Sequence, residues 1–163
     1  MRELWGHYWI FAHNGTLDGF APRLRGRFRP VGTTDSESAF CGILEAMRDA
    51  FPARMPQVGA LADLLVYLTS EVSRHGTFNY LLSNGELLFA HCADRLSYIV
   101  RRAPFTTAHL VDEDVEVDFS QVTTPDDRVA VVATAPLTDN EPWTALASGE
   151  LAAFRNGERV DFD

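Results

Sequence analysis

Two stretches of helical hydrophobic periodicity dominate the first half of the chain. The first follows Thr34, which together with Glu37 has the spacing of a capping box, in which each side chain bonds the other residue's backbone N–H. The second runs from about Val58 to Arg74, and Gly76 is a fitting stop for it. The apolar positions are Phe40, Ile43, Leu44 and Met47 in the first helix and Leu61, Ala62, Leu65, Leu68 and Val72 in the second.

The segment before the first helix predicts a strand and a loop. Trp9 to Ala12 is a short apolar run that indicates a buried strand. Residues 18–34 are rich in Gly, Pro and Arg and predict a long loop, and loops of this length are often functional. The arginines Arg23, Arg25, Arg27 and Arg29 are expected to lie on its solvated surface.

From Thr77 onward the pattern is that of strands. The pairs Asn84-Gly85 and Asn156-Gly157 predict hairpins, because Asn-Gly accepts the positive φ angles of a tight primed turn. Further strands are expected at Ser97 to Arg102 and at Arg128 to Thr134, and the second of these, the most apolar, is expected at the centre of its sheet. The order predicts an α+β protein with two helices packed on an antiparallel sheet.

Charge and composition narrow the functional classes. The chain has 163 residues, enough for one domain, and a net charge of −9 that argues against a nucleic-acid binder. It contains neither a membrane-length apolar run nor a signal peptide, so we expect a soluble, cytoplasmic protein. The acidic run from Val111 to Phe119 lacks the ligand spacing of a calcium loop and favours a half-exposed strand.

The cysteines and histidines predict no metal site, disulfide or cofactor. Cys41 and Cys92 are far apart and match no metal spacing, so we expect both to be buried free thiols. The five histidines form no H-x-x-x-H or H-x-x-H pair.

The third Asn-Gly pair, in His13-Asn14-Gly15, differs from the other two because a long loop follows it, not a partner strand. It is either a plain turn or an oxyanion hole, in which an Asn side-chain amide and a Gly backbone N–H converge on one carbonyl oxygen. Asp35 is a second candidate. Beyond the cap formed by its neighbours, its carboxylate in the first helical turn could hold an ammonium group.

Taken together, "FAHNG" and "GTTDSE" resemble the class-II (type-2, N-terminal-nucleophile, Ntn) glutamine amidotransferases, in particular the YafJ-like group. "RELWG", "RRAPF", "DEDVEVDFS" and "PLTDNEPW" agree with this resemblance, which covers the whole chain. It implies a four-layer αββα sandwich and hydrolysis of glutamine, or of a related γ-glutamyl amide, to glutamate and ammonia. It also implies that Asn14 and Gly15 form the oxyanion hole, that Asp35 binds the substrate ammonium, and that His13 supports this loop.

The chain departs from the family at the nucleophile. The family attacks with an N-terminal cysteine whose own α-amino group is the base, and here Arg2 stands where that cysteine is expected. Cys41 and Cys92 are not N-terminal and are not expected to replace it. We therefore expect residues 1–163 to be the C-terminal portion of one such domain, with an incomplete sandwich and no activity alone. Three explanations for the missing nucleophile remain open. The start site was placed too far downstream, the gene is truncated, or the protein has lost its catalytic activity and kept the binding half.

Two functional hypotheses remain open at this point. The chain is either part of a glutamine amidotransferase, or a non-catalytic module that binds glutamine or a γ-glutamyl amide. Its expected partners are that substrate and either a second copy or an ammonia-accepting synthetase. No ATP-binding phosphate loop is present. Exposed strand edges and apolar faces of an incomplete sandwich predict that the chain made alone is poorly soluble or dimeric.

Overall fold

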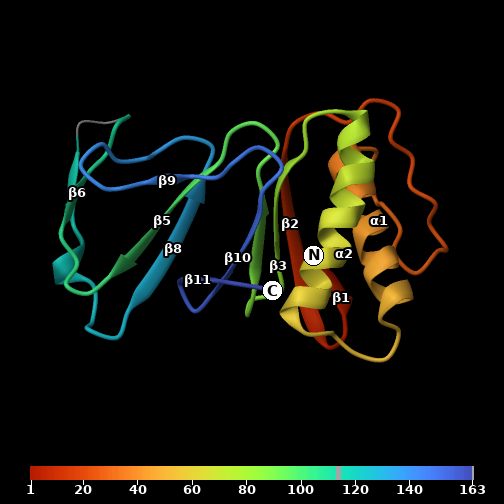
Figure 1. Cartoon of the computed structure of the whole chain (residues 1–163), viewed down its shortest axis with the longest axis horizontal. Coiled ribbons are helices and arrows are strands. Elements are labelled where there is room, and N and C mark those ends of the chain that lie inside the picture. Colours follow the sequence, from red (N-terminus) through yellow and green to blue (C-terminus); the bar gives the residue numbers. More distant parts are fainter. Residues whose placement is uncertain (113–114, 163) are drawn as a thin grey trace.

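The computed structural model describes residues 1–112 and 115–162 and arranges them in three layers (Figure 1). Two helices form one outer layer, a six-stranded antiparallel sheet forms the middle, and a three-stranded antiparallel sheet forms the other outer layer. A two-stranded ribbon lies beyond the second sheet. The predicted α+β class, with two helices followed by antiparallel strands, is confirmed.

The elements have the following bounds and order. The helices are α1 (Asp35–Ala50) and α2 (Val58–Val72), and a 3-10 turn, Ser73–His75, continues α2. The first sheet has the order β1 (Arg2–Leu4), β2 (His7–Asn14), β3 (Asn79–Ser83), β4 (Leu88–His91), β10 (Leu151–Arg155) and β11 (Glu158–Val160). The second sheet has the order β8 (Arg128–Ala133), β5 (Ser97–Arg102) and β9 (Thr144–Ala145). The ribbon consists of β6 (Thr107–His109) and β7 (Glu116–Asp118), and the 3-10 turn Phe119–Gln121 follows it.

The helical stripes pack on the first sheet as their periodicity predicts. All four predicted apolar positions of α1 are buried, and so are those of α2 except Leu68, which is half-buried. Thr69 is buried beside it, because its hydroxyl finds a partner in the phenol of Tyr80 at 3.0 Å. The two helices therefore cover the first sheet with an almost continuous apolar surface.

Only one of the two hydrogen bonds of the predicted capping box at the start of α1 is present. Thr34 caps the helix as predicted, with its hydroxyl accepting from the backbone N–H of Glu37 at 3.2 Å. The Glu37 carboxylate does not return to Thr34 and instead accepts from the N–H groups of Val31 and Gly32 at 2.9 and 2.7 Å. The loop folds back over the helix start and offers these two donors, so the carboxylate binds the loop and not the cap residue.

Strand β2 is buried on one face only. The prediction of a buried strand is correct for one face only, because Trp9 is completely buried while its neighbour Ile10 is 54% exposed. Trp9 and Phe11 belong to the face that packs on the helices, whereas Tyr8 and Ile10 lie on the opposite face. The second sheet covers that opposite face over β4 and β10 but leaves Tyr8 and Ile10 exposed.

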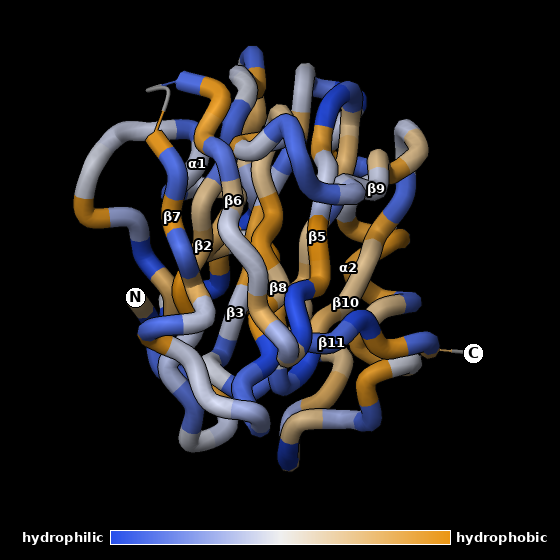
Figure 2. Tube along the Cα trace, turned by 90° about the vertical axis from the view of Figure 1, so that its left-hand side faces the viewer, coloured by the Kyte–Doolittle hydropathy of each residue, from blue (hydrophilic) through white to orange (hydrophobic). Residues whose placement is uncertain are grey.

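The second sheet packs on the first through a smaller apolar cluster. Phe154 and Ala152 of β10 meet Tyr98 of β5 and Val132 of β8 there, and Figure 2 looks onto this sheet from its outer side. The expectation that β8 is central was wrong, because within the described residues β8 pairs with β5 alone and forms an edge. The apolar residues of β8 pack between the two sheets. Such packing needs an apolar face but no second neighbouring strand, so it is compatible with an edge position.

The two hairpin turns differ in their backbone. At Asn156 and Gly157 both φ angles are positive, at 52° and 73°, so this is the predicted primed turn between β10 and β11. At the other hairpin only Gly85 has positive φ, and the connection is longer. There the Asn84 carboxamide oxygen accepts from the N–H of Leu87 at 2.8 Å, so a side-chain bond replaces the predicted tight turn.

Three residues of the acidic run form a strand. Glu116–Asp118 is β7, while residues 113–114 of the run lie outside the described residues. Neither helix of the described part is long and apolar enough to cross a membrane.

Candidate functional site

A cavity of about 500 Å³ opens where strands of both sheets end. Asn14 and Gly15 lie at the end of β2, Asn79 begins β3, and Thr134 and Ala135 follow β8. The cavity is also lined by Thr16, Asp18, Gly76, Thr77, Asp94 and Arg95. The structure therefore places the predicted Asn-Gly pair at a polar cavity between the two sheets.

Asn14 presents a free amide to this cavity. It is exposed, and its side-chain amide has no hydrogen-bond partner among residues 1–112 and 115–162. Its backbone belongs to β2, and its carbonyl accepts from the Asn79 carboxamide at 3.2 Å. A polar group fixed by its backbone and left unpaired at the tip is available to a ligand.

Gly15 is required by a close contact between two backbone segments. A Cβ atom at this position would overlap the carbonyl oxygen of Thr77, and one at Gly76 would overlap the carbonyl oxygen of Thr16. The N–H of Asp18 donates to the carbonyl of His75 at 2.8 Å and fastens the same two segments. The sequence suggested an open approach for a substrate, and the structure adds a packing reason for the glycine.

Asp35 ties the start of α1 to the loop after Gly15. One carboxylate oxygen accepts from the N–H of Leu17 at 2.8 Å and the other from the N–H of Ser36 at 2.7 Å. These bonds, led by that from Leu17, hold the pKa of the Asp35 carboxyl below its usual range. Asp35 is not among the residues that line the cavity, so the structure places it next to the Asn14–Gly15 loop but not inside the cavity itself.

His13 has both ring nitrogens engaged by the protein. Its Nε2 lies 3.0 Å from the carbonyl oxygen of Thr77, and because a carbonyl only accepts, this nitrogen carries a proton. Its Nδ1 lies 2.9 Å from the hydroxyl of Ser36. His13 therefore connects the end of β2, the start of α1 and the Thr77 segment, which is the arrangement of a residue that positions the loop.

Asn79 and Asp94 line the same cavity, although no sequence motif pointed to them. Asn79 is buried, and its amide donates both to the Asn14 carbonyl and, at 2.7 Å, to the carboxylate of Asp94. Its carboxamide oxygen accepts from the N–H of Ala93 at 2.8 Å, and the bond to Asp94 lowers the pKa of that carboxyl. A polar residue opening an otherwise apolar strand was the only available signal for Asn79.

The two cysteines lie in the core and not at the cavity. Cys41 and Cys92 are fully buried and free, as predicted. Burial raises the pKa of both thiols, which disfavours the thiolate that a nucleophile needs. Among the described residues, no group of three or more His, Cys, Asp or Glu side chains is placed to hold a metal ion.

Comparison with known proteins gives one consistent family. The family model of class-II glutamine amidotransferases matches residues 1–162. The chain is 48% identical to the "Putative glutamine amidotransferase YafJ" of Escherichia coli over 98% of its own length and 62% of that protein. It is 41% identical to the "Putative glutamine amidotransferase" of Haemophilus influenzae over 98% of its own length and 54% of that protein.

A solved structure agrees with these relatives. The crystal structure of a "predicted glutamine amidotransferase" from Pseudomonas aeruginosa matches with a TM-score of 0.87 and 51% identity, over 98% of this chain and 62% of that one. The chain thus spans 54% to 62% of the length of the relatives named here.

Proposed function

This chain belongs to the class-II glutamine amidotransferases, and on that premise we propose that it provides part of a site that hydrolyses the side-chain amide of glutamine to glutamate and ammonia. The observation that carries this proposal is the unpaired Asn14 amide beside Gly15 at a cavity between the two sheets. Amide hydrolysis passes through a tetrahedral intermediate whose oxygen becomes negatively charged, and donors fixed in advance stabilise that charge.

In the proposed reaction, Asn14 and Gly15 are the donors to the oxyanion. The amide of Asn14 and the backbone N–H of Gly15 bind the oxygen as the carbonyl carbon is attacked. The contacts of Gly15 with Thr77 and of Asn14 with Asn79 support this role, because donors held rigidly need no rearrangement during the reaction.

Asp35 and His13 have binding and supporting roles in the proposal. The Asp35 carboxylate binds the α-ammonium group of the substrate, and its lowered pKa keeps it charged. Its oxygens already accept from Leu17 and Ser36, but a carboxylate has about four lone-pair sites and can accept further donors. His13 is placed by its two hydrogen bonds to hold the Asn14 loop towards α1.

We place the nucleophile outside these 163 residues. The burial of both cysteines and the greater length of the relatives support this assignment. An N-terminal cysteine attacks the amide carbon, its α-amino group takes the thiol proton, ammonia leaves, and water then hydrolyses the thioester. Residues 1–163 are then the C-terminal portion of one domain, whose fourth, helical layer is contributed by that further segment.

The test uses the protein purified from its own host. Its intact mass gives the length of the native chain, and release of glutamate from glutamine gives the activity. Asn14→Ala is expected to lower the rate about a hundredfold or more, as loss of an oxyanion donor does. Thr134→Ala, which changes the same cavity without removing such a donor, is the matched control and is expected to leave the rate within about threefold.

The outcomes separate the two functional hypotheses. Glutamate release that depends on Asn14 supports the enzyme. A native mass of 18.2 kDa without activity, but with calorimetric binding of glutamine that Asp35→Asn abolishes, supports the non-catalytic binding module instead. Hydrolysis undiminished in Asn14→Ala contradicts the proposed oxyanion hole, and neither activity nor binding contradicts both hypotheses.

A further inference from the structure

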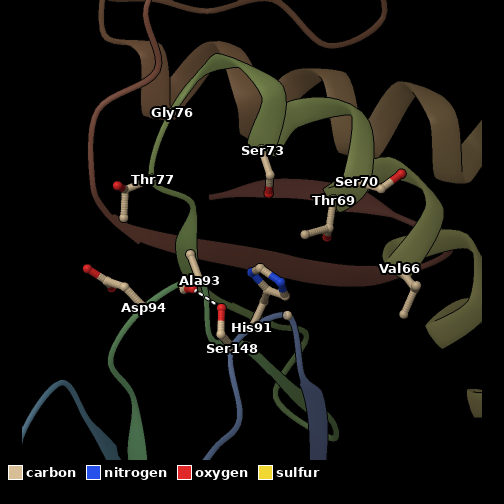
Figure 3. Close-up of a pocket in the computed structure, with 11 residues that line it drawn as sticks. Val66, Thr69, Ser70, Ser73, Gly76, Thr77, His91, Ala93, Asp94 and Ser148 are labelled. Carbon is tan, nitrogen blue, oxygen red and sulfur yellow. Dashed lines mark hydrogen bonds between the residues drawn. The ribbon is translucent and has the colours of Figure 1, made fainter.

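A second cavity, of about 450 Å³, lies on the helical side of the first sheet (Figure 3). It is bounded by the end of α2, by the turn that follows that helix, and by the loop around Ser148. Gly76, Thr77 and Asp94 line both cavities, but Asn14 and Gly15 line only the first. The second cavity is thus a separate space with a shared wall.

His91 gives this cavity an unpaired acceptor on a largely buried side chain. The residue is only 4% exposed, and its Nδ1 lies 2.7 Å from the carbonyl oxygen of Phe78, so Nδ1 is the nitrogen that carries the proton. Its Nε2 has no hydrogen-bond partner among the described residues. Figure 3 shows the ring rising from the sheet towards Thr69 and Ser73.

The ring of His91 is fixed and uncharged. It stacks on Tyr80 with ring centroids 5.4 Å apart, and its Nδ1 is held by the carbonyl of Phe78, which directly precedes the neighbouring strand β3. Burial lowers its pKa, so the neutral form with a lone pair on Nε2 dominates at neutral pH. Nε2 is not among the fully enclosed polar atoms without a partner in the described chain, so it is reached from the cavity, where a ligand can donate to its lone pair.

The surroundings favour a positively charged donor. The only carboxylate that lines the cavity in the described chain is Asp94, and no arginine lines it. The C-terminal end of α2 borders the cavity, and although Arg74 and His75 lie in the 3-10 turn that continues this helix, neither of them lines the cavity. The hydroxyl groups of Ser70, Ser73 and Ser148 add acceptors around the rim.

We propose that this cavity is a binding site for a small primary ammonium compound, whose N–H groups donate to His91 Nε2 and to the hydroxyls at the end of α2. An anion is disfavoured there by Asp94 and by the helix end. The site is distinct from the proposed glutaminase site and does not rest on it, because neither Asn14 nor Gly15 lines it. A bound ammonium would stabilise the Gly76–Thr77 segment that both cavities share.

The experiment is a titration of the 163-residue chain with ethanolamine at neutral pH, followed by NMR of the histidine ring nitrogens. The Nε2 resonance of His91 is expected to shift saturably, and acetate at the same concentrations is expected to leave it unchanged. His91→Asn keeps a donor for the Phe78 carbonyl but removes Nε2, and is expected to weaken binding at least about tenfold in calorimetry.

Two further variants keep the result interpretable. Ser73→Ala removes a rim hydroxyl that makes no other side-chain hydrogen bond in the described structure, and is expected to weaken ethanolamine binding several-fold without loss of folding. His7→Asn, on the surface at the start of β2, is the control and should bind normally. Absence of a saturable His91 shift, an equal shift with acetate, or full-strength binding by Ser73→Ala and His91→Asn would overturn the proposal.

Discussion

At the scale of single residues, Gly15 and Gly76 let two backbone segments approach more closely than any side chain permits. Gly15→Ala would push a methyl group into the Thr77 carbonyl, and we expect it to lower the free energy of unfolding by at least about 2 kcal/mol. Urea unfolding followed by circular dichroism measures this change. The same shift of the two segments would move the Asn14 amide away from its position.

Gly19→Ala is the control for this prediction. Gly19 lies in the same loop with φ at +64°, but a Cβ there meets nothing within 4 Å. Only the backbone strain of about 1 kcal/mol is then expected. Equal losses in the two variants would mean that the contact with Thr77 is not the reason for glycine at position 15.

Asp35 gives a prediction about pH. Hydrogen bonds place its pKa in the folded state below the ordinary value of 3.8, so its contribution to stability is fully present above that value and is lost as the pH falls through the folded-state pKa. Asp35→Asn should therefore be less stable than the unmodified chain at pH 7, and the difference should shrink below about pH 4. Urea unfolding at pH 7, 5 and 3 measures it.

Asp63→Asn is the matched variant for Asp35. Asp63 is an exposed carboxylate on α2 without a hydrogen bond or ion pair among the described residues. Its replacement should change the free energy of unfolding by less than about 0.5 kcal/mol at each pH. A stability difference for Asp35→Asn that grows as the pH falls would show that the Leu17 and Ser36 bonds do not favour its charged form.

At the scale of elements, the loop at residues 18–34 is organised by one buried carboxylate of α1. Glu45 is 3% exposed, and one of its oxygens accepts from the backbone N–H groups of Arg27 and Phe28 at 2.9 and 3.1 Å. Phe28 is itself buried against the helix layer. The loop backbone is therefore fastened to α1 at its midpoint, although its arginines face solvent as predicted.

Glu45→Ala should release this loop. Because trypsin cleaves after arginine, loss of the two backbone bonds should speed tryptic cleavage at Arg23, Arg25, Arg27 and Arg29 by about tenfold or more. Limited proteolysis with mass spectrometry identifies the cleaved bonds. Glu86→Ala, at an exposed turn, is the control, and trypsin should cleave its loop at the same rate as in the unmodified chain. Unchanged cleavage in Glu45→Ala would mean that Phe28 alone holds the loop.

Local signals explain which elements were predictable. The helices and the primed turn at Asn156 depend on contacts within a few residues, so periodicity and turn chemistry were sufficient to predict them. The Glu37 cap, the Asn84 turn and the edge position of β8 depend on partners that are distant or that compete locally. The pattern of residues along the chain does not show which of these partners will lie in contact.

The residues of the candidate site also fall into two groups, those that local motifs identified and those that depend on long-range contacts. Asn14, Gly15 and Asp35 were identified because they belong to short motifs with a recognisable order. Asn79 and Asp94 come from other elements and reach the cavity only through the sheet order β2-β3-β4. Their link to Asn14 is a long-range hydrogen bond, so it becomes visible only when the sheet is assembled.

At the scale of the whole molecule, the first sheet has an open apolar area on β2. Tyr8 and Ile10 lie side by side on its face towards the second sheet and are 64% and 54% exposed, because that sheet covers only the β4 and β10 side. The edge strands β1 and β11 also have a free side in the described chain. An apolar strand face beside an open edge favours association with another copy.

We therefore expect the 163-residue chain to associate as its concentration rises, with sedimentation velocity as the measurement. Tyr8→Lys should shift the midpoint of association to at least about tenfold higher concentration, because a charge on this face must be desolvated for contact. Tyr67→Lys is a closely matched control, since Tyr67 is 63% exposed but lies on α2. Association weakened equally by both variants would point to general surface charge, and a chain that stays monomeric at all concentrations would show that the exposed face of β2 does not drive self-association.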